Sequence, residues 1–87
     1  MRTKTEILQL VEAVRGQMGR RPDAFAIGVE GECSRALAVP ARELRRWTAK
    51  RSDEVREALQ FGSVERVRNY NAGRRWALAW IRSPSGK

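Results

Sequence analysis

Arginine is the residue type that gives this chain its most distinctive chemistry. Eighteen Lys and Arg stand against ten Asp and Glu, so the formal net charge is +8. Residues 1–40 hold six basic and five acidic side chains, whereas residues 41–87 hold twelve basic and five acidic ones. Guanidinium groups bind phosphate and guanine through paired hydrogen bonds. The second half of the chain therefore attracts polyanions, in a way that salt would screen.

Ten cations between residues 42 and 75 are the candidate contacts to such a polyanion, and nine of them are Arg. Double-stranded DNA is the partner that this pattern favours. An acidic protein partner is the alternative, and a merely solubilising surface is the third interpretation. The candidate DNA-binding residues are Arg42, Arg45, Arg46, Lys50, Arg51, Arg56, Arg66, Arg68, Arg74 and Arg75.

The residues of an active site or a metal centre are missing from the sequence. There is no His, the commonest general base and metal ligand. Cys33 is the only cysteine, so we expect a buried core residue rather than a nucleophile or metal ligand. Glu30 and Glu32 are predicted to lie, with Asp23, on a solvated face. We therefore predict no enzymatic activity, no cofactor and no metal.

A chain of 87 residues is long enough for one small core. We expect a single domain over residues 1–82 and a flexible tail over residues 83–87. No apolar run has the length of a membrane span or a signal-peptide core, so a cytoplasmic protein is expected. Pairing of two copies would bury more surface, and the sequence leaves a homodimer open.

The first half of the chain is predicted to supply scaffold. Thr3 and Glu6 have the spacing of a capping box. Ile7, Val11 and Val14 then fall on one face of a helix that ends near Gly19. Residues 24–39 are ambiguous: Asp23 could cap a helix, whereas the alternation of apolar and small residues also fits a strand, and we favour a helix or an irregular element.

Two helices and a hairpin are predicted to position the cations. Pro40 begins a helix over residues 41–50, and Ser52 caps a second over residues 52–59 that Gly62 ends. Alternation of Trp76, Leu78 and Trp80 then indicates a strand, joined to residues 64–70 by an Asn/Gly turn at residues 71–74. The alternative is one amphipathic helix over residues 63–82 with Gly73 in its middle. Trp76 and Trp80 are expected to pack in the core, with base stacking as their alternative role.

The segment from residue 39 to residue 80 resembles a winged helix-turn-helix domain. In that resemblance residues 41–48 are the entry helix, residues 49–51 the turn and residues 52–59 the recognition helix. The wing corresponds to residues 62–78, with its tip at residues 69–74. The fold class that the resemblance implies is α+β: helices followed by a C-terminal β-hairpin wing. Its implied function is that of a small regulator of transcription, of a kind that would suit a phage or plasmid.

The resemblance has departures and a competing register. The family usually has a small residue at Arg45, an aliphatic one at Thr48, Gly at Ala49 and an aliphatic one at Lys50. The segment 52–59 is also acidic, which suits an acidic-protein binder better than a helix facing phosphates. In the competing register, residues 33–47 supply the helix-turn-helix core and residues 41–50 become the recognition helix.

Overall fold

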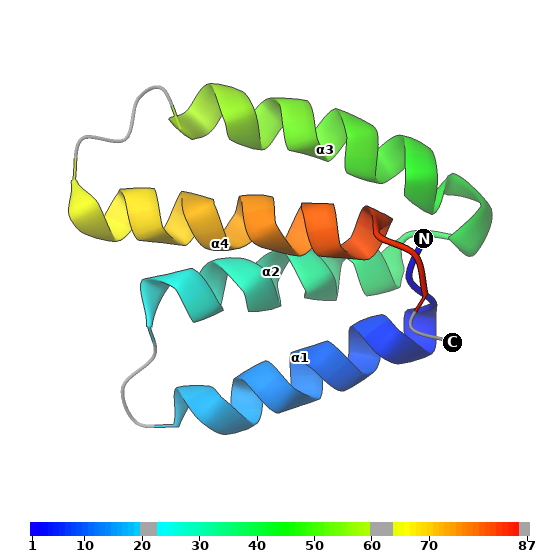
Figure 1. The fold of residues 1–87 in the computed structure, drawn as a ribbon, viewed down its shortest axis with the longest axis horizontal. Coiled ribbons are helices and arrows are strands. Elements are labelled where there is room, and N and C mark those ends of the chain that lie inside the picture. The colour runs from blue at the N-terminus through cyan, green and yellow to red at the C-terminus, as the bar shows by residue number, and fades with distance from the viewer. Residues whose placement is uncertain (20–22, 60–63, 86–87) are drawn as a thin grey trace.

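The computed structural model describes residues 1–19, 23–59 and 64–85. Over these ranges the chain forms four α-helices: α1 (Lys4–Met18), α2 (Ala24–Ala38), α3 (Leu44–Leu59) and α4 (Glu65–Arg82). A single turn of 3-10 helix, Ala41–Glu43, leads into α3. Helices α2 and α4 lie beside each other in the middle, α1 packs on α2, and α3 packs on α4 (Figure 1). None of the described helices is long and apolar enough to cross a membrane.

The predicted α+β fold with a hairpin wing is wrong, because no strand occurs in the part of the chain that the structure describes. Residues 65–82 form one helix, the alternative that the sequence had left open. Leu78 is fully buried in it, whereas Trp76 exposes 45% of its surface. The alternation of Trp76, Leu78 and Trp80 therefore does not mark one buried strand face.

Gly73 is the residue that made a helix here look improbable, and its packing explains why the helix forms. A Cβ atom at Gly73 would lie 2.0 Å from the carbonyl oxygen of Phe25 in α2. One at Gly28 in α2 would lie 2.2 Å from the carbonyl oxygen of Tyr70 in α4. The two glycines thus let α2 and α4 touch backbone to backbone. Close packing of this kind offsets the roughly 1 kcal/mol that a glycine costs a helix.

The turn predicted at residues 49–51 is also wrong, because α3 runs without interruption from Leu44 to Leu59. Ser52 does not cap a helix. Its hydroxyl instead donates a hydrogen bond of 2.7 Å to the carbonyl oxygen of Thr48, one turn earlier. The entry helix and recognition helix of the winged resemblance are therefore one element. The predicted end at Gly62 lies outside the described residues.

Helix α1 matches its prediction. Thr3 and Glu6 form the capping box, with a hydrogen bond of 3.1 Å in each direction. Ile7 and Val11 are buried against α2 and α4, and Gly19 follows the last turn with φ of 48°. The ambiguity over residues 24–39 is resolved as a helix, since Asp23 accepts a hydrogen bond of 2.7 Å from the backbone of Phe25.

The core draws on all four helices and includes Cys33, as predicted. Its buried members are Ile7, Val11, Val29, Cys33, Ala36, Leu44, Ala77 and Ile81. Lys4 closes the end of α2, because its ammonium group donates to the carbonyl oxygens of Ala36 and Leu37 at 2.8 Å and to that of Val39. Carbonyls in the last turn of a helix lack the usual amide partner one turn later, although that of Ala36 also accepts from the backbone of Val39 at 3.1 Å, and the helix dipole favours a cation there.

The two ends of the chain meet beside α1. The backbone of Arg2 donates to the carbonyl oxygen of Ile81 at 2.8 Å, and its guanidinium lies 4.7 Å from the ring of Trp80. Of the tail predicted over residues 83–87, Ser83 accepts a hydrogen bond from Arg2 and Ser85 donates one to Glu6.

Candidate nucleic-acid interface

The structure divides the ten candidate cations into four groups. Arg51 and Arg74 bind a carboxylate in the interior. Arg42, Arg45, Arg46 and Lys50 are exposed along the first half of α3 and the turn before it. Arg56 and Arg75 line a cavity between α3 and α4, and Arg66 and Arg68 are exposed near the start of α4.

Arg51 and Arg74 converge on Glu32, whose side chain is completely buried in α2. Arg51 donates to both carboxylate oxygens, at 2.8 and 2.9 Å, and Arg74 donates at 3.0 Å. A fourth bond, of 3.2 Å, comes from Arg35. The prediction that Glu32 lies on a solvated face is therefore wrong.

Ionisation of Glu32 depends on these partners. Burial opposes the charged form most strongly, but the hydrogen bonds and charges of Arg51 and Arg74 outweigh it, so the pKa of Glu32 stays below its ordinary value. Arg74 also donates to Asn71 at 3.0 Å and lies 5.4 Å from the ring of Tyr70. Arg51 and Arg74 therefore join α3 and α4 to α2 through Glu32. Because their guanidinium groups are used in this way, they are not candidate DNA contacts in this structure.

The second group forms what we call the α3 basic face: Arg42, Arg45, Arg46 and Lys50. All four side chains are exposed, while Leu44 and Thr48 on the opposite side of the helix are buried. Within the described ranges, no acidic side chain lies within ion-pair distance of any of the four. Their charges are therefore exposed to solvent and form no ion pair with the described residues, although Glu43 lines the same hollow as Arg46 and Lys50.

Charge runs along α3 in the direction opposite to the one that the helix dipole favours. The first turn contains Arg45 and Arg46 and no acidic residue. Acidic side chains lie at position 43, in the 3-10 turn directly before α3, and at positions 53, 54 and 57 in its second half. Cations near a helix N-terminus cost stability rather than add it. The placement of these arginines is therefore not explained by the stability of α3.

The third group surrounds a cavity of about 150 Å³ between α3 and α4, lined by Ser52, Arg56, Arg75, Ala79 and Arg82. We call it the interhelical cavity. Arg82 was missing from the sequence prediction. The signal was present, because Arg68, Arg75 and Arg82 are seven residues apart and share one side of a helix. Reading residues 64–82 as a hairpin concealed it.

Arg66 and Arg68 were predicted to flank the tip of a wing, and that placement is wrong because both lie in α4. Arg66 lines a separate hollow of about 220 Å³ with Ala24, Ile27, Val67 and Tyr70, at the far end of the molecule from the start of α3. Arg68 lies two helical turns before Arg75, on the same side of α4.

Trp76 stacks on Trp80 with ring centroids 6.4 Å apart and remains half exposed.

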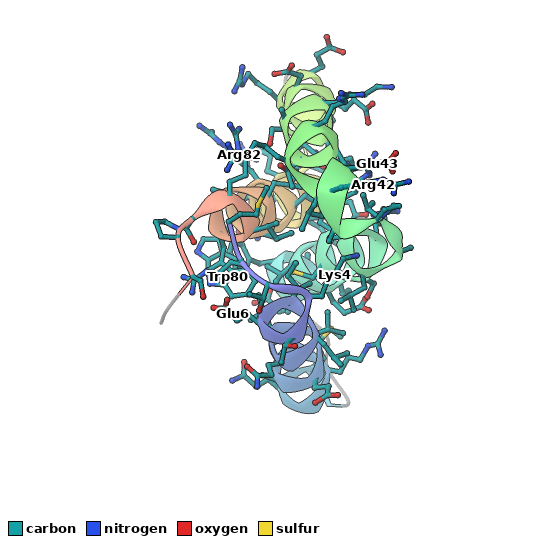
Figure 2. All side chains as sticks on the ribbon, turned by 90° about the vertical axis from the view of Figure 1, so that its right-hand side faces the viewer. Lys4, Glu6, Arg42, Glu43, Trp80 and Arg82 are labelled. Atoms are coloured by element: carbon teal, nitrogen blue, oxygen red, sulfur yellow. The ribbon has the colours of Figure 1, made fainter. Side chains whose placement is uncertain are left out.

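Figure 2 shows how the basic groups are distributed around α3. Arg82 lies on the side of α4 that faces α3, and Arg42 lies on the other side of α3. Arg42 of the α3 basic face and Arg82 of the interhelical cavity therefore lie on opposite sides of α3 in this view. Cations are thus present on both sides of α3.

Among the described residues, Cys33 and the carboxylates do not form a cluster suited to catalysis. Burial raises the pKa of Cys33 to about 12, with further contributions from the charges of Glu32 and Glu30, so its thiol is unreactive. Glu30 is engaged by Arg15 at 2.9 Å and by Ser34 at 2.6 Å. Across the residues that the structure describes, no cluster of three His, Cys, Asp or Glu side chains could hold a metal ion.

Comparisons of this chain with models of protein families, with curated proteins and with solved structures each found no match.

Proposed function

We propose that the protein binds double-stranded DNA with α3 directed into the major groove. The observation that carries the proposal is the α3 basic face: four exposed cations without ion-pair partners among the described residues, two of which, Arg45 and Arg46, lie in the first turn against the preference of the helix dipole. A surface that costs the free protein stability is expected where a partner supplies the compensating charge. Phosphate oxygens supply it along a nucleic-acid backbone.

The shape of the surface favours duplex DNA over an irregular polyanion. The major groove is about 12 Å wide and admits one α-helix between its two phosphate backbones. Cations lie on both sides of α3, with Arg42 on one and Arg82 on the other (Figure 2). We expect each flank to meet one backbone, and Arg45 and Arg46 to reach phosphates or guanine edges. This proposal keeps the competing register of the helix-turn-helix resemblance, in which residues 41–50 are the recognition helix, and it includes no wing.

A small domain that occupies a DNA site in this way would act as a regulator of transcription. The acidic second half of α3, at positions 53, 54 and 57, would repel a backbone. We therefore expect only the first half of α3, and the turn before it, to enter the groove. Arg42 and Lys50 are eight positions apart, which corresponds to a helical rise of about 12 Å at about 1.5 Å per residue.

The test is a binding titration of labelled duplex DNA at several salt concentrations. With roughly four to five phosphates contacted, the slope of log affinity against log salt should be about −4. The double variant Arg45→Gln, Arg46→Gln should weaken binding at least about tenfold. If both residues contact phosphates, the slope should also fall by about two. If they contact bases, the difference in affinity between sequences should shrink instead.

The matched control is Arg15→Gln, Gln17→Glu on α1. It lowers the net charge by the same two units, with both side chains exposed at the far side of the molecule. This control should keep most of the affinity. Equal losses in the two variants would indicate attraction by net charge alone and would overturn the proposed face. An absence of DNA binding at low salt would overturn the function and favour an acidic protein partner.

A further inference from the structure

The geometry points to a second, more specific site: the interhelical cavity is a binding pocket for a single phosphate group. Three guanidinium-bearing side chains line it, Arg56 from α3 with Arg75 and Arg82 from α4. No acidic residue lines it. Guanidinium groups that converge from two helices can enclose a tetrahedral anion with paired hydrogen bonds, which a flat basic surface cannot do.

Small side chains create the space that the arginines surround. Ser52 and Ala79 line the cavity from α3 and α4. Its volume of about 150 Å³ is that of several water molecules, each of which fills about 30 Å³ of liquid. Larger residues at positions 52 and 79 would fill this gap. The hydroxyl of Ser52 is used in its bond to Thr48, so the positive charge of the pocket comes from the arginines.

The three arginines are free to turn toward an anion. Arg56 has one acidic neighbour, Asp53, at 3.6 Å, and both side chains are more than two-thirds exposed. An ion pair that is so exposed is weak and is readily exchanged for a stronger one. Within the described residues, Arg75 and Arg82 have no hydrogen bond or ion pair from their side chains. They differ in this from Arg51 and Arg74, which Glu32 holds.

The phosphate pocket adds a specific contact to the proposed DNA-binding function. It rests on that function only for the source of the phosphate, which would be DNA. On DNA it would hold one backbone phosphate beside α3 and so fix how the helix sits in the groove. A terminal 5′-phosphate offers the same chemistry. Binding of phosphate itself requires no nucleic acid, which allows the pocket and the function to be tested separately.

The first experiment follows backbone and arginine side-chain resonances of the free protein by NMR during addition of inorganic phosphate, at ionic strength held constant with chloride. We expect saturable shifts confined to residues 52–56 and 75–82. The variant Arg75→Gln, Arg82→Gln should lose them. The control Arg42→Gln, Arg46→Gln removes the same charge outside the pocket and should keep them. Shifts that never saturate, or that both variants lose equally, would overturn the pocket.

The second experiment measures affinity for one duplex with and without 5′-phosphates. Tighter binding of the phosphorylated duplex, abolished in Arg75→Gln, Arg82→Gln, assigns the pocket to strand ends. Equal binding of the two duplexes, with a salt slope reduced by about one in that variant, assigns it to the internal backbone. Saturable phosphate binding without DNA binding would keep the pocket and remove the DNA function. DNA binding with an unchanged slope and no saturable phosphate binding would remove the pocket alone.

Discussion

Two pairs of arginines in this protein differ in where their side chains lie and in what they bind. Arg51 and Arg74 point inward and bind Glu32, which is completely buried. Arg45 and Arg46 are exposed in the first turn of α3 and, among the described residues, form no ion pair with a carboxylate. The first pair joins three helices at one carboxylate, and the second leaves charge available to a partner.

The difference shows that cations cannot be assigned to a binding surface by their number alone. A guanidinium that pairs with a buried carboxylate stabilises the fold. A guanidinium that has no paired carboxylate in the protein is available to bind a partner. The carboxylate is the deciding residue. Glu32 could not remain charged in the interior without its arginines, and removal of one partner from a buried ion pair leaves an uncompensated charge.

The largest effect is expected from Glu32→Gln. Loss of the carboxylate leaves Arg74 without a counter-charge and Arg51 with only the exposed carboxylate of Glu54. Breaking a buried pair costs about 3–5 kcal/mol, and because both arginines keep some solvent contact we expect about 3 kcal/mol here. Urea unfolding followed by circular dichroism measures the change. The control Glu54→Gln removes an exposed carboxylate that also binds Arg51, at 3.0 Å, and should cost less than about 1 kcal/mol. Similar losses in the two variants would contradict the structural role of Glu32.

Acid should reproduce part of the Glu32→Gln effect in the unaltered protein. The pKa of Glu32 is lowered in the folded state, so its contribution to stability is complete above the ordinary glutamate value of 4.5 and is lost as pH falls through the folded value. Unfolding curves between pH 6 and pH 2 should show stability falling below about pH 4.5. The fall should be shallower in Glu32→Gln. Glu30→Gln is the necessary comparison, because the pKa of Glu30 is also lowered, chiefly by its hydrogen bond with Ser34.

Gly73→Ala tests the close approach that brings Arg74 within reach of Glu32. Alanine would add about 1 kcal/mol of helix propensity, but its Cβ would lie 2.0 Å from the carbonyl oxygen of Phe25. Because that atom belongs to the backbone of α2, the helices must separate, and overpacking costs up to about 3 kcal/mol. We expect a net loss of about 2 kcal/mol in the same unfolding assay. Gly16→Ala has open space at its Cβ and should instead stabilise α1 by roughly 0.5–1 kcal/mol. A stabilised Gly73→Ala would contradict the backbone contact.

Local signals in the sequence were sufficient for the first helix, whereas composition could not separate the exposed cations of α3 from Arg51, which is paired with Glu32. The capping box of Thr3 and Glu6 involves neighbours in sequence, so its residues can be recognised without the rest of the fold. The hairpin prediction failed because Gly73 was interpreted as a turn residue, whereas its partner is the backbone of Phe25, 48 positions earlier. The role of Glu32 was missed for the same reason. Its partners Arg51 and Arg74 are 19 and 42 residues away, and no local pattern identifies them.

The smallest effect, and the sharpest contrast with Glu32→Gln, is expected for the stability of Arg45→Gln, Arg46→Gln. These cations oppose the dipole at the start of α3, and one such charge costs about 0.3–1 kcal/mol at low salt. Their removal should therefore stabilise the free protein by about 0.5 kcal/mol, measured by urea unfolding at low ionic strength, and the gain should shrink in high salt. The same variant is expected to lose DNA affinity, so stability and binding should move in opposite directions. Such opposition is the mark of residues kept for a partner at the expense of the fold. A variant that is less stable than the parent would place Arg45 and Arg46 with Arg51 and Arg74, as arginines that the fold itself requires.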